Sequence, residues 1–429
     1  MNVTPLVIVL ILFLLNVPIG FSLIGGSMVY FLFMSNSMPA ALVLQNFVSG
    51  LESFPLLAIP FFILAGVIMN YSGISKRLMH FADLLVGHMP GGLGQVNVVL
   101  SALMGGISGS ANADAAMQCK ILVPEMEKRG FPTAFSASVT ATSSIIPTII
   151  PPGIMLILYS MVARVSVGTV FLAGYLPGLV ITVCLMAAVH MESVKNGYGR
   201  TREKMASPGE IFAGAMSALL ALLMPILIIM GLRFGAFTPT EGGAIACAYC
   251  FIVGVLVYKE LKLKDLVPIF KESIDSTAQV MFIIVGANLF GMYLSYERIP
   301  HMVAQLVLSM SANKYVFLLL VNLFLLVVGM FVEGGPAIII IAPLLVPILN
   351  SLGINLVHFG IVMTLNMAIG GITPPFGSML FVVSSLLKVE MWDLLKANFK
   401  FLIATLVALL IITYIPAISL VLPNALGLH

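Results

Sequence analysis

Long apolar stretches, separated by short polar or Gly/Pro-rich segments, run through the whole chain. Stretches such as 218–230 and 401–422 are predominantly apolar and carry no charge, which is typical of helices that cross a membrane. The chain is 60% hydrophobic and 9% charged, whereas soluble domains carry roughly 25% charged residues. The pattern predicts an all-α polytopic membrane protein.

Two segments of the chain share one pattern. Residues 98–152 align without a gap with residues 321–375, at a shift of 223 positions and with 13 identities in 55. A Val-Pro pair, a glycine seven residues after that valine and a Pro-Pro pair recur at equal spacing. Paired Gly/Pro interruptions in corresponding halves indicate the binding site of a secondary transporter.

The basic residues predict how the chain is threaded. Two basic loops, 195–204 and 259–271, flank an apolar pair at 211–233 and 238–258, so both loops are expected on the cytoplasmic side. Threading from these loops predicts a span at 277–295 that crosses outward. It places both termini outside and gives the two halves opposite orientations, which is an inverted repeat. The predicted parts are repeat one at 1–190, a cytoplasmic linker at 191–210 and repeat two at 211–429.

Each half is predicted to hold a re-entrant helical hairpin followed by a broken helix. The hairpins are expected near 97–122 and 315–349, and the broken helices near 131–163 and 355–387. The amphipathic segment 75–94 and its counterpart 298–310 are expected to lie in the membrane interface. They would be arms that connect a fixed scaffold to a mobile transport core.

The first predicted hairpin tip is rich in small and polar residues. Every residue of 105–114 except Ile107 is small or polar, which suits a tip that turns toward a water-filled site. Its carbonyl, Ser and Asn oxygens suit Na⁺, and the N–H groups at the next helix start suit an anion. Ser108, Asn112 and Asp114 are therefore candidates for binding cargo. Close helix packing by small residues is the alternative.

Three prolines in six positions interrupt the first broken helix. Pro147, Pro151 and Pro152 must break the helix in mid-span. Hydroxyl groups accompany this break, from Thr142, Ser143, Ser144 and Thr148. A simple proline kink is the alternative.

The second half carries equivalent motifs at 329–336 and 366–378. Glu333 is an acid within a membrane segment, which points to a role in binding a cation or cargo or in locking the tip. A structural pair with a buried donor is the alternative. Gly335, in the same tip, is also a candidate for binding the cargo. Arg298 is a candidate for an anionic group of the cargo, although snorkelling at the membrane edge explains it equally well.

A third motif, at 235–243, forms the outward turn of the hairpin that opens the second half. Thr240 is the expected N-cap of the helix there, and Glu241 is expected to stabilise its first turn. Coupling to H⁺ instead of Na⁺ through Asp114, Glu241 or Glu333 stays open. Cys247 and Cys250 lie in an apolar run, so neither a metal site nor a redox site is expected, and the net charge of +3 gives no nucleic-acid signal.

At these motifs the chain resembles the large membrane subunit of the tripartite ATP-independent periplasmic (TRAP) transporters. The motifs are Gly-Ser-Ala-Asn-Ala-Asp-Ala-Ala at 109–116, Ile-Ile-Pro-Pro-Gly at 149–153, Phe-Thr-Pro-Thr-Glu at 237–241 and Gly-Gly-Ile-Thr-Pro-Pro-Phe-Gly at 370–377. Their order is specific, the resemblance covers nearly the whole chain, and it is nearest to the sialic acid branch.

The resemblance implies more than the residues show. It implies a bacterial inner membrane, so that the two termini placed outside by the threading are periplasmic, and Na⁺-driven uptake by an elevator mechanism with two or more Na⁺ sites. It also implies a small four-helix membrane subunit, expected as a separate polypeptide, and a periplasmic substrate-binding protein. The Na⁺ ligands it implies in this sequence are Ser108, Ser110, Asn112, Ser143 and Gly153 in repeat one, and Gly334, Thr373, Pro374 and Gly377 in repeat two.

The sequence therefore predicts a transporter subunit, not an enzyme. Its expected cargo is an organic acid, with sialic acid favoured and a C4-dicarboxylate next. The alternative is a self-sufficient Na⁺/dicarboxylate symporter that works without a binding protein. A membrane scaffold that transports nothing would leave the paired broken helices unexplained.

Overall fold

The computed structural model describes residues 4–15, 17–34, 45, 54–299, 302, 313–374 and 377–427. All regular elements in these residues are helical. Within them, six helices are long and apolar enough to cross a membrane, and up to nine spans result if each of three bent helix pairs counts as one. The all-α polytopic class is confirmed.

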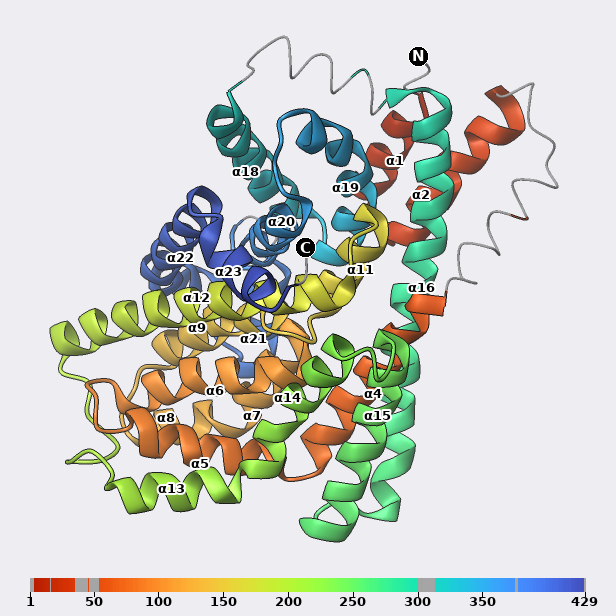
Figure 1. Ribbon diagram of the computed structural model, residues 1–429. Helices are drawn as coiled ribbons and strands as arrows, with labels where there is room; N and C mark the ends of the chain where they lie inside the picture. The colour runs from red at the N-terminus through yellow and green to blue at the C-terminus, as the bar shows by residue number, and fades with distance from the viewer. Residues whose placement is uncertain are drawn as a thin grey trace.

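One side of the molecule is a group of long helices that we call the frame (Figure 1). In it, α16 lies along α2 and α4, and α15 packs against α4. Gly286 brings α16 close to α2, because a Cβ atom there would lie 2.9 Å from the Gly20 carbonyl oxygen. The frame helices are α1 (Thr4–Leu14), α2 (Ile19–Val29), α4 (Ala58–Tyr71), α15 (Pro239–Ile252) and α16 (Leu266–Tyr296). Short π-helical segments, η1 (Tyr30–Met34) and η3 (Val253–Val257), and short 3-10 helices, η2 (Phe54–Leu57) and η4 (Leu263–Asp265), accompany them.

The rest of the first half follows a sharp corner after α4. The next helix, α5, is bent by 73° from α4, and Gly73 occupies the corner with a φ of 77°. A tight turn at Gly109 and Ser110, the first tip, joins α6 to α7. The helices are α5 (Ile74–Val86), α6 (Gly92–Ser108), α7 (Ala111–Ile121), α8 (Val123–Lys128), α9 (Thr133–Ser143), α10 (Ile146–Ile149), α11 (Ile154–Ala163) and α12 (Val167–Asn196).

The second half has a similar order of elements. Val332 and Glu333, the second tip, join α18 to α19, and the chain is interrupted again between α20 and α21. The helices are α13 (Pro208–Ser217), α14 (Leu219–Arg233), α18 (Lys314–Phe331), α19 (Gly334–Ser351), α20 (Leu356–Gly370), α21 (Ser378–Leu387), α22 (Met391–Tyr414) and α23 (Ala417–Ala425).

Helix ends recur at the shift of 223 residues that relates the two sequence motifs. The end of α6 corresponds to the end of α18, and the starts of α7 and α9 correspond to those of α19 and α20. Helix packing is reciprocal as well. α6 lies on α9 and α10, and α18 lies on α20, whereas α7 lies on α21 and α19 lies on α11. The second helix of each hairpin thus contacts the broken helix of the other half.

Buried amides tie the first helix of each hairpin to its broken helix. The Ser143 hydroxyl donates to Asn97 Oδ1 at 2.7 Å, and Asn366 Nδ2 donates to Asn322 Oδ1 at 2.8 Å. Ser143 and Asn366 occupy equivalent positions at the shift of 223. Since polar groups buried in an apolar interior are costly when unpaired, these bonds fix how each hairpin sits on its broken helix.

Three predicted boundaries differ from the structure. The stretch 211–233 was expected to be one helix, but α13 and α14 meet at an angle of 65°, because α13 lies along α5, with Gly214 against Leu84. The span predicted at 277–295 begins much earlier, at Leu266. Helix α12 continues into the predicted linker as far as Asn196. The proposed outer arm, 298–310, lies mostly outside the described residues.

The contact between α18 and α20 gives a stability prediction. A Cβ atom at Gly370 would overlap the backbone of Gly329, so Gly370→Ala should force the two helices apart and cost about 1–3 kcal/mol. Thermal denaturation of the purified protein should show a lower melting temperature.

Gly291→Ala is the matched control, because Gly291 is also helical and a Cβ there meets no described atom within 4 Å. That variant should melt at or slightly above the wild-type temperature, since alanine favours a helix. Equal melting temperatures for Gly370→Ala and Gly291→Ala would contradict the close backbone contact.

Candidate functional site

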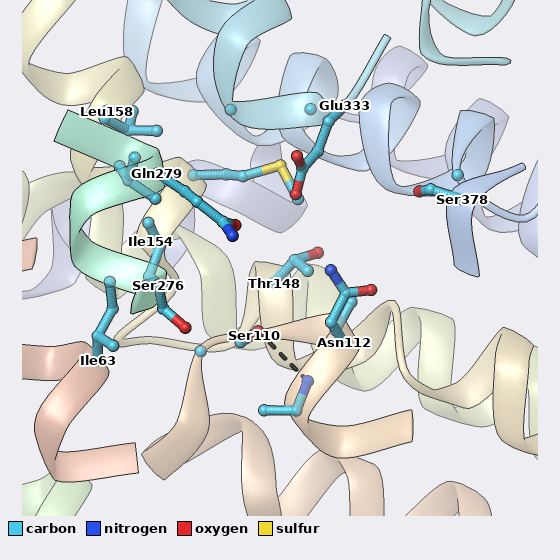
Figure 2. Close-up of a pocket in the computed structure, with 18 of the residues that line it drawn as sticks. Ile63, Ser110, Asn112, Thr148, Ile154, Leu158, Ser276, Gln279, Glu333 and Ser378 are labelled. Atoms are coloured by element: carbon cyan, nitrogen blue, oxygen red, sulfur yellow. Dashed lines mark hydrogen bonds between the residues drawn. The ribbon is translucent and has the colours of Figure 1, made fainter. Parts of the chain in front are cut away.

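The two tips face each other across a cavity of about 360 Å³ (Figure 2). Helices α4, α11, α16, α20 and α21 complete its walls. Its polar lining includes the following described side chains: Ser110, Asn112, Thr148, Glu272, Ser276, Gln279, Glu333 and Ser378. The volume lies within the range of about 300–1,000 Å³ that is usual for small-molecule sites.

The first tip rests directly on the first helix break. Gly109 has a φ of 56°, and a Cβ atom on it would collide with the Pro152 carbonyl oxygen. The Ile154 amide donates to the Gly109 carbonyl at 3.4 Å, and Gly153 lies against the Thr148 carbonyl. Several main-chain oxygens therefore converge here, which is the donor set that Na⁺ sites in broken helices use.

The residues after the first tip start α7 with its amides toward the cavity. Ser110 is the N-cap, and its hydroxyl accepts from the Ala113 amide at 3.4 Å. Asn112, two residues after Ser110, is exposed to the cavity. The first turn of a helix carries partial positive charge, so this end of α7 suits a negatively charged group.

The second tip starts α19 at the cavity, as the first tip starts α7. Glu333 is the N-cap residue of α19 without a side-chain cap bond, and its carboxylate points into the cavity opposite Asn112 (Figure 2). Gly334 lies against the side chains of Met155 and Met367, so the second tip touches the broken helices of both halves. Gly335 lines the cavity as well.

The second helix break gathers a further set of oxygens. The Thr373 hydroxyl donates to the Ile369 carbonyl at 2.6 Å. A Cβ atom at Gly377 would lie 2.9 Å from both the Gly371 and the Thr373 carbonyl oxygens. Pro374 is exposed at the same break. Main-chain oxygens thus converge at this break as they do at the first.

Two residues expected to bind cargo lie away from the cavity. Asp114 is fully buried, and its Oδ2 accepts hydrogen bonds from Ser101 Oγ and Gln118 Nε2, both at 2.7 Å. Arg298 follows the far end of α16, about 25 Å along the helix from Gln279. In this structure Asp114 therefore turns into the protein and Arg298 lies far from the cavity, and the assignment of both residues to the cargo stays a prediction.

The cation ligands predicted in repeat one are only partly brought together. Ser110 and Asn112 lie at the first tip and Gly153 lies at the first break. Ser143 is fully buried a short way along the broken helix, bonded to Asn97. Ser108 ends α6, and its side chain lies outside the described part of the structure. Among the described residues, three or more His, Cys, Asp or Glu side chains nowhere form a metal-binding group.

Sequence reasoning missed the part of the cavity that α16 contributes. Glu272, Ser276 and Gln279 all line it, and Figure 2 shows Ser276 and Gln279 directed into the space between the tips. Their spacing of four and three residues, which places them on one helix face, was the available signal. It was overlooked because the predicted span began only at residue 277.

The motif at 235–243 has a structural role at the start of α15. Thr238, not the expected Thr240, is the N-cap, since Pro239 takes the first helical position. The Glu241 carboxylate accepts from the Thr238 amide at 2.7 Å and completes a capping box. The expected helix-start role of Glu241 is confirmed.

Comparison with known families finds one that covers nearly the whole chain. The model of the tripartite ATP-independent periplasmic transporter, DctM component, matches residues 6–418. The chain is 38% identical over 409 residues to the sialic acid TRAP transporter large permease protein SiaM of Vibrio cholerae, with 95% of each protein covered. It is 36% identical over 431 residues to the C4-dicarboxylate TRAP transporter large permease protein DctM of Rhodobacter capsulatus, with 97% of each covered.

Two solved transporter structures have a similar fold. The YdaH transporter of Alcanivorax borkumensis gives a TM-score of 0.60 at 13% identity, covering 99% of this chain and 98% of the other. MtrF of Neisseria gonorrhoeae gives 0.56 at 14% identity, with 96% and 95% covered. At these identities the likeness concerns the fold alone.

Asp114 is buried in a hydrogen-bond network whereas Asn112 faces the cavity, so replacing each of them should affect stability differently. Asp114→Ala should leave the buried Ser101 hydroxyl without its acceptor and should leave Gln118 Nε2 with Ser101 Oγ alone, which costs about 1–3 kcal/mol. Asn112→Ala removes a side chain that faces the cavity and should leave the stability of the empty protein unchanged. Melting temperatures of both variants without Na⁺ or cargo would test this, and a stable Asp114→Ala variant would contradict the buried network.

Proposed function

Because the chain belongs to the DctM family, the large permease subunits of TRAP transporters, we propose that it carries an organic acid across the bacterial inner membrane together with Na⁺. The observation that supports this most is the cavity between two facing tips, each backed by a helix break. Helix interruptions at membrane depth are tolerated where they line a polar cavity, and there they bind ions and cargo.

Sodium coupling is supported by the oxygen atoms at the two breaks. Main-chain carbonyls converge around Gly109 and Gly153 in one half and around Gly377 in the other. We propose one Na⁺ site at each break, with Thr373 adding a hydroxyl to the second. Neutral oxygens without a clustered set of carboxylates suit a monovalent cation better than Ca²⁺ or Zn²⁺.

Binding of an acid is supported by the two helix starts. The N-terminal turns of α7 and α19 both point at the cavity, and their partial positive charges would hold a carboxylate. Na⁺ ions bound nearby would add to this field. The similar permeases named above are transporters for sialic acid and for C4-dicarboxylates, so both kinds of acid are candidates, with sialic acid favoured.

An elevator mechanism fits the way the helices are grouped. The hairpins and broken helices contact each other reciprocally, so they can move as one body. The frame meets that body along α16 and α19 and along α4 and α6. We propose that the body slides against the frame to expose the cavity on alternate sides, with α5 and α13 as a connecting arm.

The proposed partners are a small four-helix membrane subunit and a periplasmic substrate-binding protein that delivers the cargo. Both termini of this chain are proposed to be periplasmic. The competing function is a symporter that takes its cargo directly from solution. The two differ in one respect that uptake experiments can measure, namely the need for the binding protein.

Uptake into proteoliposomes tests the proposed function. The large and small subunits together should accumulate labelled acid only with an inward Na⁺ gradient and only when the binding protein is present. Replacing the Na⁺ gradient with a K⁺ gradient of equal size is the control. Uptake without the binding protein would support the self-sufficient symporter, and uptake indifferent to Na⁺ would refute the cation sites.

A matched pair of threonines tests the second Na⁺ site. Thr373→Ala should lower the apparent Na⁺ affinity about fivefold to tenfold, because one oxygen ligand is lost. Thr182→Ala is the control, since the Thr182 hydroxyl also donates to the carbonyl four residues before it but lies outside the site. The measurement is the rise of the melting temperature with Na⁺ concentration, and equal Na⁺ responses would exclude Thr373 as a ligand.

A further inference from the structure

The α16 face that lines the cavity is a separate surface from the tips. Glu272, Ser276 and Gln279 follow one another along one side of the helix, and all three border the cavity. Glu272 and Gln279 are exposed and Ser276 is half-buried. Helix α16 also packs against α19, the helix that begins at the second tip. Cargo held between the tips therefore lies next to this face.

All charged side chains in the described lining of the cavity are acidic. The described lining contains two carboxylates, Glu272 and Glu333, and none of the Lys, Arg or His residues in the described part of the chain belongs to it. The groups that favour an anion are the amides at the starts of α7 and α19, with Na⁺ at the breaks. These groups lie on the tips, where Glu333 also adds a negative charge, and α16 contributes the second negative charge, Glu272.

This arrangement distinguishes between classes of acid. One carboxylate of the cargo can be held by the helix starts and Na⁺. A second carboxylate at the opposite end of the cargo would meet Glu272 without a described cation to compensate, and like charges in a partly desolvated site repel. Hydroxyl or amide N–H groups at that end would instead donate to Glu272 and to the Gln279 carbonyl, and Ser276 can donate or accept.

We infer that the α16 face of Glu272, Ser276 and Gln279 determines cargo specificity, and that the cargo is a monocarboxylic acid rich in hydrogen-bond donors. A sugar acid belongs to this class, and a C4-dicarboxylate does not. The inference rests on the proposed function as an acid transporter, and it goes further by assigning the recognising residues. Glu272 acts by accepting hydrogen bonds at one end while the tips hold the carboxylate at the other.

Equilibrium binding to the permease itself tests this, because the selectivity of a binding protein then plays no part. The large and small subunits are purified together in lipid nanodiscs, and calorimetry in Na⁺ measures the binding of four acids. Two of them, N-acetylneuraminate and gluconate, are monocarboxylates with many donors. The other two, succinate and fumarate, are dicarboxylates.

The wild type should bind at least one donor-rich monocarboxylate about tenfold more tightly than either dicarboxylate. Glu272→Gln should weaken that binding about tenfold, since a charged acceptor is lost, and should strengthen binding of the dicarboxylates. Gln279→Ala should weaken the monocarboxylate without helping succinate, because it removes no charge.

Asp275→Asn is the matched control, because Asp275 is an exposed acid on α16 that does not line the cavity. It should bind all four acids as the wild type does. A Glu272→Gln variant that behaves like Asp275→Asn would overturn the role of this face, and a wild type that prefers succinate would overturn the cargo class.

Failure of the proposed function has a different signature. Repeating the titrations in K⁺ instead of Na⁺ separates the two, since loss of Na⁺ dependence for every acid would refute the proposed coupling and leave the ranking of the acids intact. A wild type that binds none of the four acids in Na⁺ would overturn both the inference and the proposed function.

Discussion

The cost of unpaired backbone groups in an apolar surrounding controls this structure. Each helix interruption frees amides and carbonyls that lipid cannot satisfy. The chain places two such interruptions against each other in the first half, so that the Ile154 amide bonds the Gly109 carbonyl and the tip rests on Pro152. The starts of α7 and α19 and both breaks border the cavity, which is why a mostly apolar protein has polar groups in the walls of this cavity.

Much of this arrangement could be predicted from the sequence, because Gly/Pro-rich segments within apolar stretches have few possible structures. The two tips, both helix breaks and the Gly329 contact lie in segments that the motifs singled out. Glu241 was correctly interpreted as a helix-start residue. In these cases the local sequence determines the backbone conformation. Proline has no backbone N–H to donate and so interrupts a helix, and glycine has no side chain and so allows another backbone to approach closely.

The sequence does not show the direction of a side chain that depends on distant partners. Asp114 belongs to a polar motif, yet Ser101 and Gln118 turn its carboxylate inward, and Ser101 comes from the preceding helix. The bend after Ser217 is not visible in a continuous apolar run, because it results from contact between α13 and α5. The α16 face was missed for a related reason: its polar spacing is clear, but only the tertiary structure shows that a cavity lies beside it.

The long helix α16 has a consequence for energetics as well as for recognition. Part of the cavity wall belongs to the frame helices α4 and α16, and part belongs to the tips. A cavity formed jointly by the frame and the tips has its complete set of walls at only one relative position of the two. Any displacement between them must change the affinity for whatever is bound inside, and reciprocity then requires the occupant to shift the equilibrium between positions by the same factor. A single coupling free energy therefore links the occupancy of the cavity to the relative position of the frame and the tips.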